Sequence, residues 1–190
     1  MKPYKNFAPQ PIFERQNLPA GCYIAKVYDV ALEEGNYGER LLIQFDIHEG
    51  EYADFFNKDW KNSDPELRKW RGTYRLYVPT DSTTEKREFT KRIFEQGIWA
   101  FEQSNNGFHW AWDEKQLKGL FVGVKFRNRE YDFEGRHGWR TECCGLCEIQ
   151  SIREGRAKTP KDKPLDKPAS GSAQAANSGY VDVPEDELPF

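Results

Sequence analysis

The strand pattern is clearest in Gly119-Leu-Phe-Val-Gly-Val-Lys-Phe-Arg-Asn-Arg-Glu-Tyr131. Side chains of a β-strand point alternately to opposite faces. One face of this stretch is apolar and consists of Leu120, Val122, Val124 and Phe126. The other face combines rings with cations: Phe121, Lys125, Arg127, Arg129 and Tyr131. Rings and cations together are typical of surfaces that bind single-stranded nucleic acid, although an ordinary solvated strand face is the alternative interpretation.

The composition bounds the size and the class of the protein. The chain has 190 residues, a hydrophobic content of 37 % and a mean hydropathy of −0.89, which predicts one packed domain with an unpacked tail. Aromatic residues make up 15 % and include six Trp, a high share for so polar a chain. The net charge of −3 excludes a surface that is basic all over, so a nucleic-acid site would be a local patch.

The N-terminal residues carry no signal for export. Pro3, Pro9 and Pro11 interrupt the first 18 residues, which contain no apolar run. No segment approaches the roughly 18 apolar residues of a membrane span. The four cysteines of such a chain are expected to be reduced thiols. We therefore expect a cytoplasmic protein without a membrane partner.

Periodicity predicts five strands and one long helix. The strands are expected at 22–32, 40–48, 73–78, 119–131 and 139–149, and the helix at 84–103. In the second strand Leu41, Ile43, Phe45 and Ile47 are predicted to face inward, and Leu42, Gln44, Asp46 and His48 outward. The connection 49–71 is predicted to hold a short helix over 64–70, with Asp64 as its cap and Pro65 at its first position.

The predicted order of elements is β-β-β-α-β-β. A five-stranded barrel whose one main helix lies between the third and fourth strands has the order of an OB-fold. The alternative all-β architecture is a sandwich, which usually needs about seven strands. We therefore predict an all-β OB-fold barrel with one main helix over residues 1–152.

The composition changes after residue 152. Residues 153–179 are predicted to be a flexible linker, first basic and then rich in Ala, Ser and Gly without an apolar period. Residues 180–190 form an acidic tip, which would steer toward a basic partner surface. Its last side chain, Phe190, adds a ring and a terminal carboxylate for a partner pocket. The predicted partner-binding residues are Asp186, Glu187, Leu188, Pro189 and Phe190.

These segments resemble a known family. The last five residues are similar to the acidic tip of bacterial single-stranded DNA-binding proteins, which end in acids, an aliphatic residue, Pro and Phe. The body resembles the phage-encoded single-stranded DNA-binding proteins of Gram-positive hosts. Four segments carry this likeness: Leu18-Pro-Ala-Gly-Cys-Tyr-Ile24, Phe45-Asp-Ile-His-Glu-Gly-Glu-Tyr52, Trp70-Arg-Gly-Thr-Tyr-Arg75 and Trp112-Asp-Glu-Lys-Gln-Leu-Lys-Gly119.

The resemblance implies an OB-fold that binds single-stranded DNA with little sequence preference. It also implies coating and protection of single strands during phage or mobile-element replication and recombination in a bacterial host cell. The tip would recruit replication, repair or recombination enzymes. The body does not resemble the cellular bacterial protein, so the tetramer of that protein is not implied, and whether this chain forms a homo-oligomer is left open.

Rings and cations on outward strand faces and in the connections are the predicted contacts to DNA. OB-folds bind oligonucleotides with this strand surface and the neighbouring loops. Closing the ends of the barrel is the alternative role for several rings, among them Trp60, Trp110 and Trp112. The predicted DNA-binding residues are Trp60, Trp70, Arg71, Arg75, Tyr77, Lys125, Arg127, Arg129, Tyr131, Trp139 and Arg140.

Other chemistry is less favoured by the sequence. Cys144 and Cys147 form a C-x-x-C pair, but side chains three apart on a regular strand point to opposite faces, so we expect buried thiols and no metal. The acidic residues at 46, 49, 51 and 54 could form the cluster of a metal nuclease, but no catalytic Lys or His pattern frames them. We therefore predict a binding protein without cofactor or enzymatic activity; a strand-annealing or recombination mediator is the alternative.

Overall fold

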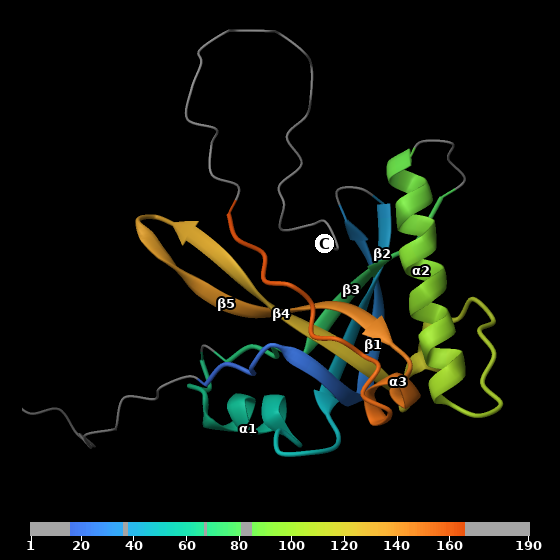
Figure 1. Cartoon of the computed structure of the whole chain (residues 1–190), viewed down its shortest axis with the longest axis horizontal. Helices are drawn as coiled ribbons and strands as arrows, with labels where there is room; N and C mark the ends of the chain where they lie inside the picture. Colours follow the sequence, from blue (N-terminus) through green and yellow to red (C-terminus); the bar gives the residue numbers. More distant parts are fainter. Residues whose placement is uncertain (1–15, 36–37, 67, 81–84, 166–190) are drawn as a thin grey trace, which may run out of the picture.

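The structure, a computed structural model, describes residues 16–35, 38–66, 68–80 and 85–165. In this part the protein is mostly β, with five strands and three α-helices (Figure 1). The strands are β1 (Gly21–Gly35), β2 (Gly38–Ile47), β3 (Thr73–Tyr77), β4 (Phe121–Phe133) and β5 (Arg136–Cys147). The helices are α1 (Phe55–Asn62), α2 (Glu85–Ser104) and α3 (Ile149–Arg153), with one 3-10 turn, η1 (Glu114–Leu117).

The five strands form one antiparallel sheet in the order β3-β2-β1-β4-β5. The central strand β1 pairs with β2 over residues 25–35 and with β4 over residues 21–26. A bulge between Val27 and Asp29 bends β1 at the point where it leaves β4. At its other end β1 begins at Gly21, opposite Phe126, so the outer half of the β4–β5 hairpin extends beyond β1 as a projecting arm (Figure 1).

The predicted antiparallel strands and the long helix between the third and fourth strands are confirmed. The edge strands β3 and β5 approach each other, but the pairings found among the described strands do not join them. We call the gap between these two edges the seam. Closure into a barrel, and with it the OB-fold, stays a prediction.

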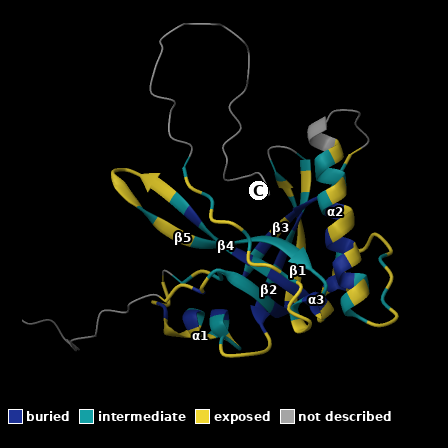
Figure 2. Cartoon of the chain, viewed as in Figure 1, coloured by how far each residue is buried: buried dark blue, intermediate teal, exposed yellow. Residues whose placement is uncertain are grey.

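The core lies between the sheet and α2, and the hairpin tip lies outside it (Figure 2). The predicted inward residues of β2 are at most 3 % exposed, because every second side chain packs on the same face. Rings fill the centre of this core: Phe45 lies 5.9 Å from Phe56 and 6.2 Å from Phe126 between ring centroids. Helix α2 contributes Phe94, Ile98 and Phe101.

Gly97 lets α2 approach the sheet closely. A Cβ atom at this position would lie only 3.1 Å from a methyl carbon of Leu76 on β3. Gly97 is therefore a contact point with the sheet, and not a break in the helix. The predicted bounds of this helix, 84–103, agree with the observed α2 to within a residue at each end.

The connection between β2 and β3 differs from the prediction. Its helix is α1 at Phe55–Asn62, and the prediction of a helix over 64–70 is wrong. Asp64 does accept an N–H, from Glu66 at 2.9 Å, but its segment forms only a turn. The rings of Phe55 and Phe56 favour the earlier position, because they pack there against the core.

Asp46 corrects the predicted outward face of β2. Its side chain is 1 % exposed and its carboxylate accepts three backbone N–H groups, from Ile47 and Phe56 at 2.8 Å and from Asn57 at 2.9 Å. Two of these donors belong to the first turn of α1, whose N–H groups have no partner within the helix. Asp46 is therefore buried instead of solvated on that face, and it ties α1 to the end of β2.

Residues 154–165, which we call the strap, continue the fold after α3. The N–H of Lys163 donates to the carbonyl of Asn128, and the N–H of Glu130 donates to the carbonyl of Lys163, both at 2.8 Å. The strap thus occupies the edge of β4 that β1 leaves open. It falls within the predicted linker, whose remaining residues 166–179 lie outside the described part, as does the tip. The division into domain, linker and tip stays a prediction.

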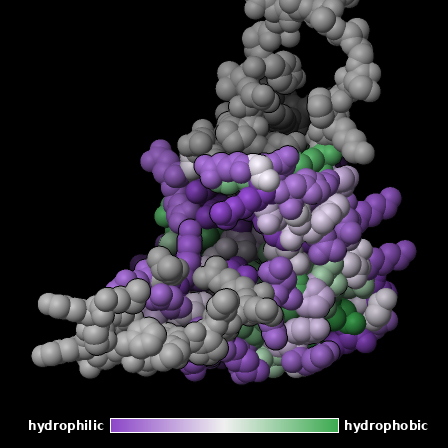
Figure 3. Space-filling view, turned by 90° about the vertical axis from the view of Figure 1, so that its left-hand side faces the viewer, coloured by the Kyte–Doolittle hydropathy of each residue, from purple (hydrophilic) through white to green (hydrophobic). Residues whose placement is uncertain are grey.

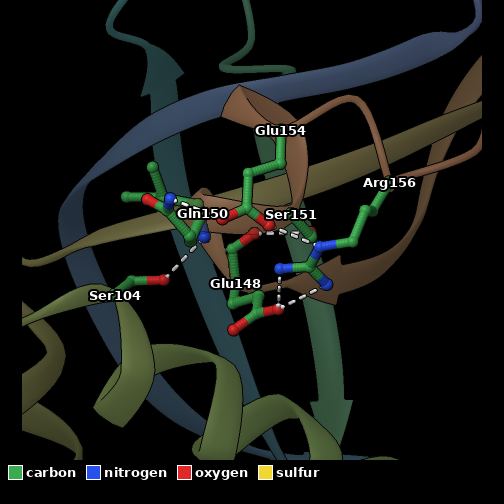
Figure 4. A network of polar contacts seen from close by, with 7 residues as sticks. Ser104, Glu148, Gln150, Ser151, Glu154 and Arg156 are labelled. Atoms are coloured by element: carbon green, nitrogen blue, oxygen red, sulfur yellow. Dashed lines mark hydrogen bonds and ion pairs between the residues drawn. The ribbon is translucent and has the colours of Figure 1, made fainter.

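Arg156 anchors the start of the strap (Figure 4). Its guanidinium donates to Glu148 at 3.1 and 3.2 Å and also to Glu154. At the other end of α3, the N–H of Ile149 donates to the hydroxyl of Ser104 in the last turn of α2. These contacts fix α3 and the first residues of the strap against the body. Among the helices of the described part, none has the length and apolar character needed to cross a membrane.

Candidate nucleic-acid interface

A cavity of about 330 Å³ opens at the seam between β3 and the β4–β5 hairpin. Core rings such as Phe56 and Phe126 form part of its wall. Its charged lining consists of four cations and one acid: Arg71, Arg75, Arg129, Arg140 and Glu142. We call this cavity the arginine groove. Hydrophilic side chains cover most of the described surface on the side where the hairpin projects (Figure 3).

The two faces of the hairpin differ in chemistry. Residues directly opposite each other in an antiparallel pair share a face. One face, which we call the arginine face, combines the pairs Arg127–Glu142, Arg129–Arg140, Tyr131–Gly138 and Phe133–Arg136. The other face combines Asn128–Thr141, Glu130–Trp139 and Asp132–His137. The arginines thus lie on one side of the hairpin together with Tyr131 and Phe133, whereas Glu130, Asp132 and Trp139 lie on the other.

Rings stand open on the arginine face beyond the groove. Tyr131 is 36 % exposed and Phe133 is 67 % exposed. The Tyr131 ring lies over Gly138, where a Cβ atom would come within 3.0 Å of the phenol oxygen. The glycine therefore leaves room for the ring to lie across the hairpin. An exposed flat ring beside cations is the arrangement on which an unpaired base stacks.

Two guanidinium groups of the groove belong to directly opposite residues, Arg129 and Arg140. Like charges opposite each other destabilise a strand pair. Glu142 offsets part of this repulsion, because its carboxylate lies 3.4 Å from Arg129. The same carboxylate also accepts two bonds from Arg127, at 2.8 and 2.9 Å. Guanidinium groups bind carboxylate and phosphate oxygens, so the lining of the groove suits an anion.

Two arginines, Arg71 and Arg75, lie on the β3 side of the arginine groove and have different roles. Arg71 is held by Asp59 through two bonds of 2.7 and 2.8 Å, and Asp59 is 8 % exposed. This fork geometry fixes the guanidinium as part of the fold. Arg75 is exposed, and no hydrogen bond or ion pair joins its side chain to the part of the chain that the structure describes. Arg75 is therefore available to a ligand.

The predicted rings lie in different places. Tyr77 lines the groove but is only 7 % exposed, and its hydroxyl lies 3.5 Å from the guanidinium of Arg40. Trp70 donates its indole N–H to the carbonyl groups of Phe45 and Gly72, which makes it a part of the fold. The remaining two rings lie away from the groove: Trp60 stacks on Arg68 at 4.0 Å, and Trp139 lies on the face opposite the arginines.

The structure therefore brings five predicted residues into the groove, namely Arg71, Arg75, Tyr77, Arg129 and Arg140. Tyr131 adjoins them on the arginine face. Lys125 and Arg127 line a neighbouring cavity instead. Sequence reasoning missed Phe133 and Arg136, which share the arginine face. The turn between the two strands could have placed them on this face. Glu134 and Gly135 both have positive φ, 49° and 76°, as a two-residue hairpin turn requires.

A second aromatic cluster lies on the outside of α2. Trp112 is 71 % exposed and stacks on Phe94 at 5.8 Å, while its backbone has a φ of 59°. Trp110 is partly buried, and its indole nitrogen has no hydrogen-bond partner among the described residues. Of these two rings, whose role in closing the barrel or lying on the surface was left open, Trp110 is therefore packed and Trp112 lies on the surface.

The cysteines do not form a site in the described part of the chain. All four are free thiols of intermediate burial. Burial raises the pKa of Cys143 well above its ordinary value, with the neighbouring Cys144 adding to the shift. A thiol with a raised pKa is a poor nucleophile and a poor metal ligand. Within the residues described, no three side chains suited to a metal come together.

Two of the four acids that could form a nuclease cluster have other contacts. Asp46 caps α1, as described above, and Glu49 pairs with Arg153 at 2.9 Å. In comparison with known proteins, the chain matches no family model and none of the curated proteins.

Proposed function

We propose that this protein binds single-stranded DNA in the arginine groove and along the arginine face, without catalysing a reaction. The observation that carries the proposal is the excess of arginine at the seam, next to the open rings of Tyr131 and Phe133. Phosphate groups would bind Arg75, Arg129 and Arg140, while bases would stack on the rings. Stacking of this kind contributes about 1–3 kcal/mol per base and accepts any base.

The proposal includes the OB-fold, because the confirmed strand and helix order is the order of that fold. In such folds the strand surface and the loop between the last two strands contact oligonucleotides. The β4–β5 hairpin is that connection here. It further includes recruitment of replication, repair or recombination enzymes by the acidic tip in a phage or mobile-element context, which rests on the resemblance and on the charge of residues 180–190.

A salt titration of oligonucleotide binding tests the groove. Log affinity of a labelled oligo-dT, followed by fluorescence anisotropy, should fall linearly with log salt concentration, by about 0.7 for each phosphate contact. The double variant Arg75→Gln/Arg140→Gln should flatten this slope by about 1.4. The matched control is Lys115→Gln/Lys118→Gln, which removes the same charge at η1, away from the seam. Absence of binding, or tight binding that ignores salt, would contradict the proposal.

A further inference from the structure

A second cavity continues the seam beyond the arginine groove. It has a volume of about 520 Å³ and lies between α2, β5 and the strap. The groove is lined by β5 residues 140–144, and the second cavity by residues 144–146. Tyr74 and Cys144 line both cavities. The two therefore adjoin along the edge of β5 that faces β3.

The charges of the second cavity are all positive. Its lining, which consists of described residues, holds four cations and no acid: Lys125, Arg127, Lys158 and Lys161. Arg127 is held by Glu142 behind it. The side chains of Lys125, Lys158 and Lys161 have no hydrogen-bond or ion-pair partner within the described part of the chain. Three ammonium groups without a counter-charge repel one another, and a bound anion would remove that repulsion.

The strap presents its two lysines on a fixed backbone. The thiol of Cys22 on β1 donates to the carbonyl of Lys158 at 3.4 Å, and the ladder at Lys163 holds the far end. Pro160, which lies between the two lysines, restricts the backbone further. Less conformational entropy is then lost when the lysines bind a ligand than on a mobile tail.

We propose that the second cavity is a phosphate subsite, which binds the backbone of a single strand where it leaves the arginine groove. The inference rests on the proposed function and adds the strap to the binding path. Phosphate is the chemical class that fits, because the cavity offers cations but no open ring. Tyr74, its one aromatic residue, is 5 % exposed and cannot stack a base.

Oligonucleotide length separates the two cavities experimentally. OB-folds bind about 4 to 16 nucleotides each. A strand of about 4 nucleotides would occupy the groove alone, whereas a strand of about 16 nucleotides would also reach the strap. In Lys158→Gln/Lys161→Gln, affinity for the short oligo-dT should equal that of the wild type. For the long oligo-dT, the dependence of log affinity on log salt should flatten by about 1.4. Lys115→Gln/Lys118→Gln again serves as the control.

The outcomes distinguish this inference from the proposed function. If the wild type fails to bind either oligonucleotide, both are overturned. If Arg75→Gln/Arg140→Gln flattens the salt slope but the strap variant behaves like the control, only the subsite is overturned. Equal losses on both lengths would also overturn it, because the lysines would then act on the groove.

A footprint on the unmodified protein gives an independent measurement. Acetylation of lysines in the wild type, mapped by mass spectrometry, should slow at Lys158 and Lys161 when the long oligo-dT is bound. The short oligo-dT should leave both rates unchanged, and Lys115 should react alike in all three samples. Unprotected strap lysines in the long complex would refute the subsite without any variant.

Discussion

In β2 and the inner half of β4 every second side chain is buried, whereas beyond Phe126 the same alternation separates cations from acids. Ile43 and Val124 are fully buried in the core. Arg127 and Arg129, only a few residues further along β4, lie on the arginine face of a hairpin that has no helix over it. The period of a strand therefore tells which side chains share a face, but the neighbouring elements decide what that face does.

The two regions are also stabilised by different interactions. Burial of apolar surface, at roughly 25 cal/mol per Å², stabilises the core region. The outer hairpin has its backbone ladder, the contact with the strap and a few ion pairs, which contribute little when exposed. Substitutions in the core should therefore change the free energy of unfolding, and substitutions on the arginine face should change binding.

The same substitution made in both regions gives the largest contrast. Phe45→Ala should lower the free energy of unfolding by about 3–5 kcal/mol, because Phe45 is fully buried and leaves a cavity. Phe133→Ala, at the exposed tip of the hairpin, should change it by less than about 0.5 kcal/mol. Urea unfolding of both variants measures the difference, and similar losses would mean that the hairpin is packed in solution.

The buried carboxylate at the end of β2 should give the next largest effect. Asp46→Ala leaves three backbone N–H groups without their acceptor and should cost about 3 kcal/mol of unfolding free energy. Asp54, the residue before α1, makes no side-chain bond to the helix, so Asp54→Asn should cost less. Binding of oligo-dT per folded molecule should stay the same in both variants. A smaller loss for Asp46→Ala than for Asp54→Asn would contradict the capping role.

The pH dependence of stability tests the same carboxyl group. Burial raises the pKa of Asp46 above its ordinary value, although its three N–H donors offset part of the shift. The folded state then holds the proton more tightly than the unfolded state, so this group stabilises the fold most below its unfolded pKa, about 3.9. That contribution is lost as the pH rises through the folded pKa. The stability of the wild type relative to Asp46→Asn should therefore fall as the pH rises through the acid range, and an increase would contradict the assignment.

Much of the core could be predicted because its signal is local. Leu41, Ile43, Phe45 and Ile47 alternate without interruption, and the apolar stripe of α2 repeats at helical spacing. Both patterns follow from the geometry of a single element. Neither requires knowledge of the partner strand.

Asp46 and the hairpin faces depend on contacts that no single element contains. Two of the three donors to Asp46 are ten and eleven residues away, in a helix that the polar composition of the connection did not indicate. The face of Trp139 depends on the register of the hairpin, which the turn at Glu134 and Gly135 sets. A shift of the register by one residue would move every side chain of β5 to the other face. Because neighbouring side chains of a strand face opposite ways, only one of Trp139 and Arg140 can share the face of Arg129, and the register of the hairpin selects Arg140.

Two aromatic residues of the hairpin provide the finest contrast, because they lie on opposite faces but on neighbouring rungs of the ladder. Tyr131 lies on the arginine face, and Trp139 is 47 % exposed on the other. Tyr131→Ala should weaken binding of oligo-dT by about 1–3 kcal/mol, the contribution of one stacked base. Trp139→Ala should leave the affinity unchanged, although it removes the larger ring.

Anisotropy titrations at one salt concentration measure both affinities, and thermal unfolding confirms that each variant is folded. An affinity loss confined to Trp139→Ala would mean that the strand lies on the face of Glu130 and Asp132, against their charge. Equal losses would mean that the strand wraps around the hairpin. Only a loss confined to Tyr131→Ala agrees with a path that follows the arginines, because base stacking and phosphate binding must then occur on the same face.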